Sequence, residues 1–346
     1  MKILAIETSC DETAAAIIEG NSSKNKVKIL SNIVLSSLKL HAKTGGIIPE
    51  TAAREQIKYI LPVIENAFKK AKISISKNSA PDIDAISVTI GPGLIGSLLI
   101  GVETAKTLAF VWKKPIIPVN HLYGHIYANF IKQAKSKNIE FPAIVLVVSG
   151  GHTDLLLMKG HANIKWLGGT RDDAAGEAFD KTGRLLNLAY PGGPSIEKVA
   201  KKGNGKAYNF PRPLINSSDF DFSFSGLKTA VLREVKKIKR LDNKKVADLS
   251  ASVQDAIIDV LIKKTLKATN KNHAKSILIS GGVSANEKLV DQFKLAIKKN
   301  KLSISFFVPE KWLCTDNAAM IGAAAFFKGK KIPWQDIEVN PELYFN

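Results

Sequence analysis

The chain repeats one pattern of strand, small-residue turn and strand, and this repeat constrains its fold more than any other feature. Near the N-terminus, the apolar run at residues 3–6 is followed by a Thr-Ser-Cys-Asp-Glu-Thr turn and a second apolar run at residues 14–18. The same order returns with residues 143–148, a Ser-Gly-Gly-His-Thr turn and residues 154–158. Short apolar runs bounded by small polar residues are typical of strands. The repeat therefore predicts two lobes of one plan, each offering a hairpin turn to a shared cleft.

Length and composition agree with a two-lobed globular protein. The 346 residues suffice for two domains, and a Lys-rich polar stretch at residues 132–140 reads as a linker. Two cysteines, Cys10 and Cys314, provide no disulfide framework. The most apolar runs, such as residues 94–102, are too short to cross a bilayer, and acidic residues interrupt any signal-like N-terminus. We therefore expect a cytoplasmic protein without membrane attachment.

The charge balance points to a polyanionic partner without proving one. Fifty basic residues against 31 acidic ones give a formal net charge of +19. A polyanion such as nucleic acid is the direct interpretation. However, lysines are spread along the whole chain, which compositional bias alone would also produce, and the densest cluster, at residues 236–245, resembles a solvated helix end. Charge by itself leaves both interpretations open.

A histidine pair is the first candidate for chemistry. His121 and His125 stand four positions apart after a short β-branched run, so a helix starting there would place both imidazoles on one face. We expect Asp316, which opens a small-residue helix far along the chain, to be the third ligand of a metal ion. An Asp at a helix start is more commonly an N-cap, so this residue also has a purely structural explanation.

Glycine-rich turns and an acidic segment are further candidates. Residues 280–286 follow an apolar strand with two glycines, which is typical of a nucleotide-binding loop but also of an ordinary tight turn. Residues 190–197 form a Pro-Gly-Gly-Pro turn into a helix whose N-terminal amides can meet an anion. Residues 172–180 carry four carboxylates, which we expect to share part of one helix face.

Taken together and in order, these motifs closely resemble the TsaD family, the tRNA threonylcarbamoyladenosine transferases formerly described as O-sialoglycoprotein endopeptidases. The resemblance runs from the first strand to the last helix, and residues 172–181 look like the bacterial branch. The matching segments are residues 7–13, 91–93, 120–125, 149–153, 172–181, 190–194, 222–229, 280–286 and 314–319.

The resemblance implies an α/β fold of the actin, hexokinase and chaperone-ATPase (ASKHA) type, with two lobes around a central cleft. The expected N-terminal lobe comprises residues 1–118 and 320–346. Residues 119–319 would form the C-terminal lobe, which carries most of the adenylate site. The metal site would lie in the cleft between the lobes.

The resemblance also implies the residues of the site. The metal ligands would be His121, His125 and Asp316, holding one divalent ion for which Fe(II) is favoured and Zn(II) is the alternative. The implied substrate-binding residues are Val147, Val148, Ser149, Gly150, Gly151, Asp180, Gly193, Glu197 and Asn286. Tyr123 departs from the pattern, since many relatives carry an acid there. No general base is assigned, although the turn that follows the first strand offers Asp11 and Glu12.

The implied reaction transfers a threonylcarbamoyl group from threonylcarbamoyl-AMP to the exocyclic amine of the adenosine beside the anticodon, at position 37, in tRNAs that read ANN codons. The implied partners are tRNA, the adenylate donor, a shorter TsaB-like paralogue and a TsaE-like ATPase. The tRNA acceptor would account for the positive charge, because phosphate contacts are made by Lys and Arg.

Three other classes of protein fit less well. A metalloprotease of the His-Glu type places its general base directly after the first histidine, where this chain has Leu122. A sugar or carboxylate kinase of the same fold would not need the histidine pair. A non-catalytic scaffold would be expected to lack the complete set of His121, His125 and Asp316.

Overall fold

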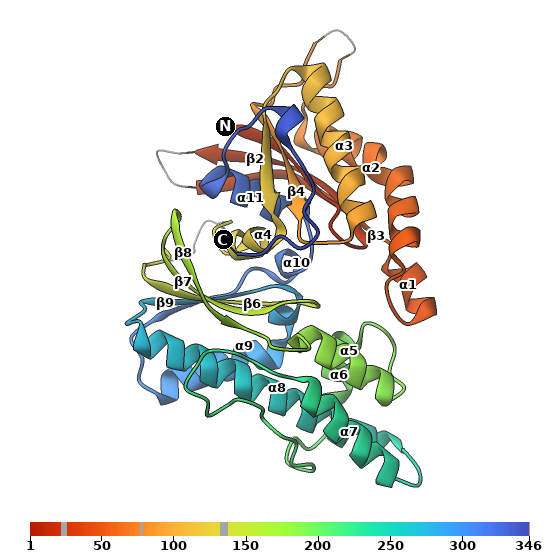
Figure 1. Cartoon of the computed structure of the whole chain (residues 1–346), viewed down its shortest axis with the longest axis vertical. Helices are drawn as coiled ribbons and strands as arrows, with labels where there is room; N and C mark the ends of the chain where they lie inside the picture. The colour runs from red at the N-terminus through yellow and green to blue at the C-terminus, as the bar shows by residue number, and fades with distance from the viewer. Residues whose placement is uncertain (22–25, 77–78, 132–137, 346) are drawn as a thin grey trace. The chain divides into compact units, whose positions relative to one another are not determined.

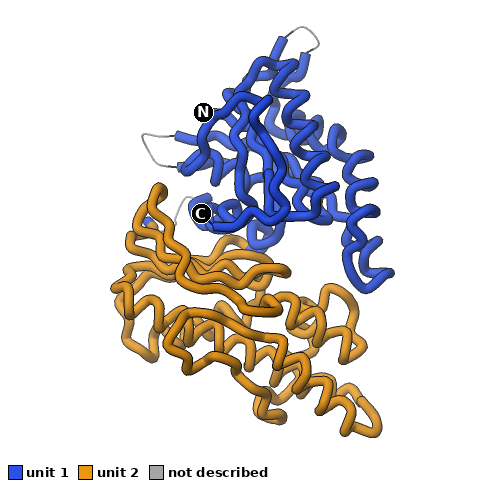
Figure 2. Tube along the Cα trace, in the orientation of Figure 1, with its two compact units in different colours: residues 1–138, 311–346 blue, residues 139–310 orange. Residues whose placement is uncertain are grey.

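The computed structural model describes residues 1–21, 26–76, 79–131 and 138–345, which form two compact units. Unit 1 comprises residues 1–138 and 311–346, and unit 2 comprises residues 139–310 (Figure 2). These boundaries differ from the expected 118/119 and 319/320, so all three candidate metal ligands belong to unit 1. Most of the expected linker, residues 132–137, lies outside the described residues.

Unit 1 is built on a five-stranded mixed sheet with the strand order β3-β2-β1-β4-β5 (Figure 1). The two N-terminal hairpins are antiparallel, whereas β1, β4 and β5 pair in parallel. The first apolar runs thus form the strands that the sequence predicts. The strands are β1 (Lys2–Glu7), β2 (Glu12–Asn21), β3 (Lys26–Ser36), β4 (Ala85–Gly91) and β5 (Ile116–Asn120).

Helices cover both faces of this sheet, and the alternation of side chains along β1 explains how. Leu4 and Ile6 belong to the apolar core that α2 and α3 complete, whereas Ala5 faces α11, where a Cβ built on Gly322 would lie 3.3 Å from its own. The helices of unit 1 are α1 (Leu38–Thr44), α2 (Pro49–Ala71), α3 (Ile95–Trp112), α4 (His121–Ala128), α10 (Lys311–Cys314), α11 (Ala318–Lys328) and the short 3₁₀ helix η2 (Trp334–Asp336).

Only part of the apolar face of α2 is buried. Ile60, Ile64 and Phe68 are buried, but Ile57 and Leu61, which the sequence places on the same face, are 66% and 56% exposed. Only three of these five residues on one face therefore pack on the core. Helical periodicity defines a face but does not say how much of its width a sheet covers.

Helix α3 extends well beyond the apolar run at residues 94–102. Among the described residues it is the one helix whose length and composition would allow it to cross a membrane, a test that core helices also pass. It carries Glu103 and Lys106, which pair with each other at 3.1 Å. Only part of this helix is buried, because Phe110 and Val111 are exposed.

Unit 2 repeats the strand plan of unit 1. Its sheet has the order β10-β9-β6-β7-β8. Here β6 pairs antiparallel with β7 and parallel with β9, as β1 pairs with β2 and β4 in unit 1. The predicted repeat is thereby confirmed. The strands are β6 (Ala143–Val148), β7 (Thr153–Gly160), β8 (Asn163–Gly169), β9 (Ser276–Ser280) and β10 (Ser305–Phe307).

The longest helix, α8, forms the centre of the unit 2 core. Its buried residues Val253, Ile257 and Leu261 share one apolar cluster with residues of β6, α5, α7 and α9. Apolar spacing along the sequence predicts this helix, and the structure confirms it over a longer range. The helices of unit 2 are α5 (Ala175–Leu185), α6 (Gly192–Ala200), α7 (Ser225–Lys237), α8 (Asn243–Lys271), the 3₁₀ helix η1 (Gly282–Ala285) and α9 (Glu287–Lys299).

Candidate metal centre and substrate loops

The structure brings the three predicted metal ligands together. His121 and His125 lie on successive turns of α4, and their ring centroids are 4.7 Å apart. Asp316 Oδ1 lies 3.5 Å from His121 Nε2 and 3.3 Å from His125 Nε2. One ligand atom from each residue therefore falls within 4.8 Å of the other two, which is a spacing that a single ion can bridge.

Local packing explains why α4 starts where it does. The strand β5 ends at Asn120, whose Oδ1 accepts a hydrogen bond from Leu122 N at 2.8 Å and so caps the helix. A Cβ on Gly124 would lie 2.7 Å from Ile321 Cδ1, so glycine allows α4 to approach α11 closely. Helix α4 and its histidines therefore belong to unit 1, near Asp316, which lies two positions before α11.

Asp316 does not serve as the N-cap of that helix. The cap of α11 is Asn317, whose Oδ1 accepts from Met320 N at 3.0 Å and whose Nδ2 donates to Thr315 O at 2.8 Å. The structural explanation that the sequence left open for Asp316 is therefore wrong. Because its neighbour caps the helix, the Asp316 carboxylate is left to reach the two imidazoles.

Glu7 is the residue that sequence reasoning missed. It ends β1 and is fully buried, and its Oε2 lies 3.1 Å from His121 Nδ1. Ser9 N and Thr89 Oγ1 donate to the same carboxylate at 2.6 and 2.5 Å. A carboxylate on the second ring nitrogen fixes the orientation and tautomer of a metal-binding histidine. The available signal was a lone acid at the end of an apolar strand.

The electrostatics of the centre favour a cation. Burial lowers the pKa of His121, but the carboxylates of Glu7 and Asp316 outweigh this effect and raise it to about 9. Burial, Asp316 and Asp11 raise the pKa of Glu12 well above its usual range. With both imidazoles neutral, the charges of Glu7 and Asp316 would match one divalent ion. Two imidazole nitrogens and a carboxylate fit Fe(II) or Zn(II) as a donor set.

The turn that carries Asp11 and Glu12 is held from α2. Gln56 Nε2 lies 3.3, 3.0 and 2.9 Å from the carbonyl oxygens of Thr8, Cys10 and Glu12. Gln56 is itself buried. The amide thereby fixes the backbone of the turn, which leaves the two candidate bases in defined positions.

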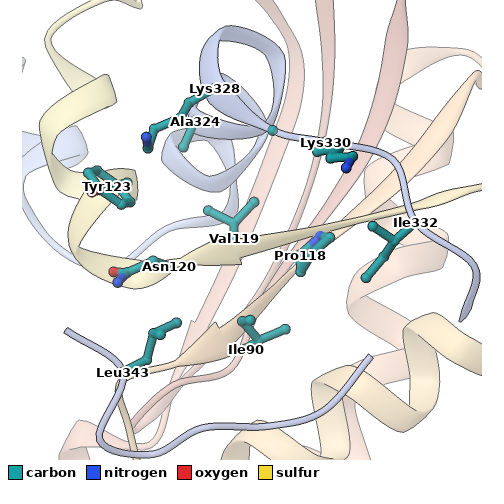
Figure 3. A pocket seen from close by; sticks show the side chains of 11 residues that line it. Ile90, Pro118, Val119, Asn120, Tyr123, Ala324, Lys328, Lys330, Ile332 and Leu343 are labelled. Atoms are coloured by element: carbon teal, nitrogen blue, oxygen red, sulfur yellow. The ribbon is translucent and has the colours of Figure 1, made fainter. Parts of the chain in front are cut away.

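A separate cavity of about 260 Å³ lies beside the start of α4 (Figure 3). Asn120 and Tyr123 line it, and Lys328 Nζ lies 4.7 Å from the centre of the Tyr123 ring. Tyr123 is two positions from His121 and so projects from a different side of the helix. Its departure from the family pattern therefore affects this cavity and not the metal ligands.

In unit 2, the hairpin turn with the expected substrate-binding residues packs on the start of α5. Val147 and Val148 end β6, and Ser149 N donates to His152 O at 2.9 Å to close the turn. Two amides of the first turn of α5 then donate to the carbonyls of Ser149 and Gly150, at 3.2 and 3.1 Å.

Hydrogen bonds of three other expected substrate-binding residues, Asp180, Glu197 and Asn286, connect the elements from α5 to α9. Asp180 Oδ1 accepts from Gly192 N at 2.7 Å, where α6 begins, and burial raises the pKa of Asp180. At the other end of α6, Glu197 Oε1 accepts from Glu287 N at 2.8 Å. Asn286 caps α9, and its Nδ2 donates to Gln254 Oε1 at 2.9 Å. These side chains thus join one region of unit 2, but their role as ligands of a substrate stays a prediction.

Glycines in this region fall into two kinds. A Cβ on Gly150 or Gly151 would meet no described atom within 4 Å, and one on Gly193 would meet only Phe179 Cβ, at 3.9 Å. In contrast, Gly281 has φ +89°, and its Cβ would lie 2.4 Å from Val148 O. The first kind leaves backbone open to a ligand, whereas Gly281 is required by the packing of the turn.

Only some of the four carboxylates of residues 172–180 lie on helix α5. Helix α5 begins at Ala175, so Asp172 and Asp173 precede it, and Lys181 lies near both Asp173 and Glu177. Asp172 accepts from the 223–225 segment, Asp173 pairs with Lys181, Glu177 accepts from Ala174 N and Asp180 accepts from Gly192 N. The helix therefore contains only Glu177 and Asp180 of the four acids, which lie three positions apart on α5.

Known proteins resemble this chain over most of its length. The family model described as "TsaD: tRNA N6-adenosine threonylcarbamoyltransferase" matches residues 28–323. A protein of that name from Syntrophomonas wolfei is 49% identical over 94% of this chain and 91% of its own length. Another, from Symbiobacterium thermophilum, is 46% identical over 98% of this chain and 94% of its own length.

Solved structures resemble the fold. HypF from T. kodakarensis superimposes with a TM-score of 0.62 at 14% identity, over 94% of this chain and 47% of that one. Full-length HypF in a phosphate- and nucleotide-bound form gives 0.59 at 11% identity, over 94% and 55%. These likenesses support the two-lobed ASKHA-type fold. The sequence matches show that the chain belongs to the TsaD family of tRNA N6-adenosine threonylcarbamoyltransferases.

Proposed function

We propose that this acyltransferase works with one divalent metal ion held by His121, His125 and Asp316. The observation that carries the proposal is the convergence of Nε2, Nε2 and Oδ1 within 4.8 Å, although the residues come from two distant segments. The burial of Glu7 against His121 supports it, because a buried carboxylate needs a positive charge nearby. We favour Fe(II) over Zn(II), and both suit this donor set.

The donor that we propose is threonylcarbamoyl-AMP, a mixed anhydride whose leaving group is AMP. The exocyclic amine of adenine is a weak nucleophile because its lone pair is delocalised into the ring, so the acyl group must arrive activated. A divalent ion, when bound, would supply a Lewis acid and a template for the phosphate or carbamoyl oxygens.

The unit 2 loops are the proposed adenylate site. Open backbone at Gly150, Gly151 and Gly193, the last in the first turn of α6, would allow close approach of the ligand. Asp180 fixes that helix start, while Glu197 and Asn286 fix the segment between η1 and α9. Val147, Val148 and Ser149 would place the turn near the reacting end.

In the reaction, the adenosine N6 attacks the carbamoyl carbon of the donor. A new N–C bond forms, the C–O bond to the phosphate breaks with its electron pair going to AMP, and one proton leaves the amine. Asp11 and Glu12 are the candidate acceptors for this proton. The proposed acceptor nucleoside is adenosine 37, beside the anticodon, of tRNAs reading ANN codons.

The proposed partners are a shorter TsaB-like paralogue and a TsaE-like ATPase, in the cytoplasm. For the paralogue, unit 1 offers an apolar surface on two packed helices. Ile57 and Leu61 on α2 and Ile95 and Leu99 on α3 are between 42% and 66% exposed. Contiguous exposed apolar side chains are typical of protein interfaces. The ATPase is proposed from the family resemblance alone.

The test combines metal analysis with transfer. His121→Ala and Asp316→Ala, purified without oxygen or chelator, are assayed with both partners, threonylcarbamoyl-AMP and unmodified tRNA. We expect both variants to lose the metal and at least about a hundredfold in rate. His273→Asn and Asp291→Ala, which alter exposed residues of unit 2, are the matched controls. Wild-type transfer by His121→Ala and Asp316→Ala would disprove the metal assignment.

A further inference from the structure

Helix α7, the loop after it and the start of α8 carry a dense cluster of basic residues. Only two acids, Glu234 and Asp242, stand among the basic residues of the 228–245 segment. These basic residues are Lys228, Arg233, Lys236, Lys237, Lys239, Arg240, Lys244 and Lys245. Eight of the chain's fifty basic residues therefore lie in this one segment.

Nearby acids neutralise only part of this cluster. Glu234 pairs with Lys237 at 2.7 Å, Asp242 pairs with Lys245 at 3.4 Å, and Asp248 pairs with Lys244. Among the residues that the structure describes, the other five basic side chains have no carboxylate partner. Arg233 and Lys236 are both exposed on α7. Their charge is thus available to an anion from outside the chain.

A hollow of about 720 Å³ adjoins these two cations. It lies between α7 and the segment 207–210, and its lining includes Arg233, Lys236 and Tyr208. The Tyr208 ring stacks on buried Phe210, with centroids 6.0 Å apart and planes at 17°. Tyr208 therefore packs on Phe210 at the wall of a hollow that three cations and one acid, Glu234, also line.

A solvated helix end explains this arrangement only in part. Lysines near a helix C-terminus are favoured by the helix dipole, which accounts for Lys236 and Lys237. It does not account for Arg233 one turn earlier, for Lys239 and Arg240 beyond the helix, or for a supported aromatic ring beside them. A cationic groove with an aromatic wall is typical of surfaces that bind single-stranded nucleic acid.

We propose that this α7 groove docks a single-stranded segment of the acceptor tRNA. Arg233 and Lys236 would contact phosphates, and Tyr208 would stack on a base. The proposal rests on tRNA being the acceptor of the proposed function. It places a tRNA contact in unit 2, the unit that carries the proposed donor loops, and uses cations that the fold itself does not pair.

The first experiment measures the affinity of the full chain for unmodified tRNA over a series of KCl concentrations. In the variant Arg233→Gln/Lys236→Gln, we expect binding to weaken about tenfold and the slope of log affinity against log salt to become shallower by roughly 1 to 2. The matched control is Lys298→Gln/Lys299→Gln, which removes the same charge from the exposed end of α9. Equal affinities and slopes for the two variants would overturn the proposal.

A second experiment separates this groove from the proposed donor and metal sites. The affinity for AMP and the metal content of Arg233→Gln/Lys236→Gln should equal those of the wild type. Tyr208→Ala should weaken binding of a short single-stranded RNA several-fold, and Tyr208→Phe should restore it because the ring is retained. An unchanged affinity in Tyr208→Ala would remove stacking from the proposal. Loss of AMP binding would show instead that the charge variant disturbs unit 2.

Discussion

Glu7 Oε2 lies 3.1 Å from Nδ1 of His121, so the end of the first strand touches a side chain that is more than a hundred residues away in sequence. Thr89 and Ser9 complete the hydrogen bonds of the carboxylate. The pair therefore ties β1, β4 and α4 together behind the candidate metal ligands. Glu7 is a positioning residue, because it reaches the proposed ion only through His121.

We predict that Glu7→Gln weakens metal binding by roughly 10 to 100-fold, the usual effect of removing such a carboxylate. Glutamine keeps the size of the side chain but loses its charge, so His121 is held less firmly and attracts the cation less. Titration of the metal-free variant with Fe(II) or Zn(II), alongside Glu19→Gln as an exposed control on β2, measures the change. Wild-type affinity in Glu7→Gln would show that the carboxylate serves only the fold.

Asp316 and Asn317 are neighbours with separable roles. Asn317→Ala removes the cap of α11 and should cost about 1 kcal/mol of unfolding free energy. Asp316→Asn removes a carboxylate that faces His121 and His125 but leaves the helix cap in place, so it should change stability less than Asn317→Ala and should abolish metal binding. Denaturant unfolding and metal analysis of both variants test this division. Asn317→Ala should show the larger loss of stability, and Asp316→Asn should show the loss of metal. If Asp316→Asn were the more destabilised of the two without metal, the division of roles would be wrong.

The repeated strand plan could be predicted because short apolar runs determine strands locally. The histidine pair could be placed for the same reason, since His121 and His125 need only one helix turn to meet. The boundary between the two units could not be predicted from local sequence. It depends on Gly124 packing against Ile321, a contact between residues far apart in sequence.

Side-chain partners were the other part that sequence patterns could not supply. The acids of residues 172–180 look alike in sequence, yet Asp172 holds a distant loop and Asp180 holds the start of α6. Likewise, Ile57 lies on the apolar stripe of α2 but beyond the width that the sheet covers. Spacing fixes which residues share a side of a helix, whereas tertiary packing decides what each one contacts.

Gly151 and Gly281 make a matched pair in the proposed adenylate site. Gly151→Ala adds a methyl group in open space, so the fold should be unaffected while affinity for AMP falls about tenfold. Gly281→Ala forces a Cβ to within 2.4 Å of Val148 O at a φ of +89°, so it should lower stability by about 1 to 3 kcal/mol. Thermal unfolding measures the stability of each variant, and titration with AMP measures its affinity. Full AMP affinity in Gly151→Ala would place the ligand elsewhere.

Lys264 is fully buried in unit 2, and its ammonium is met by Asp219. Lys264 Nζ lies 3.2 Å from Asp219 Oδ1 and also donates to Ser217 Oγ. The Ser217 hydroxyl, the Asp221 amide and the Lys264 ammonium hold the pKa of Asp219 well below its usual range. The ionised carboxylate therefore stabilises the folded state above the pKa of an unfolded Asp, about 4, and this contribution is lost as the pH falls further.

We predict that Asp219→Asn is less stable than the wild type at pH 7 and that this difference shrinks as the pH falls below about 4. The buried ammonium loses its counter-charge in the variant, whereas in the wild type acid removes the same charge by protonation. Urea unfolding of Asp219→Asn and of the wild type between pH 7 and pH 2.5 measures the difference in stability at each pH. Lys264→Met/Asp219→Asn should recover much of the loss, because an apolar side chain of similar length needs no counter-charge. A difference that stays constant with pH would mean that shape, rather than charge, explains the effect of Asp219.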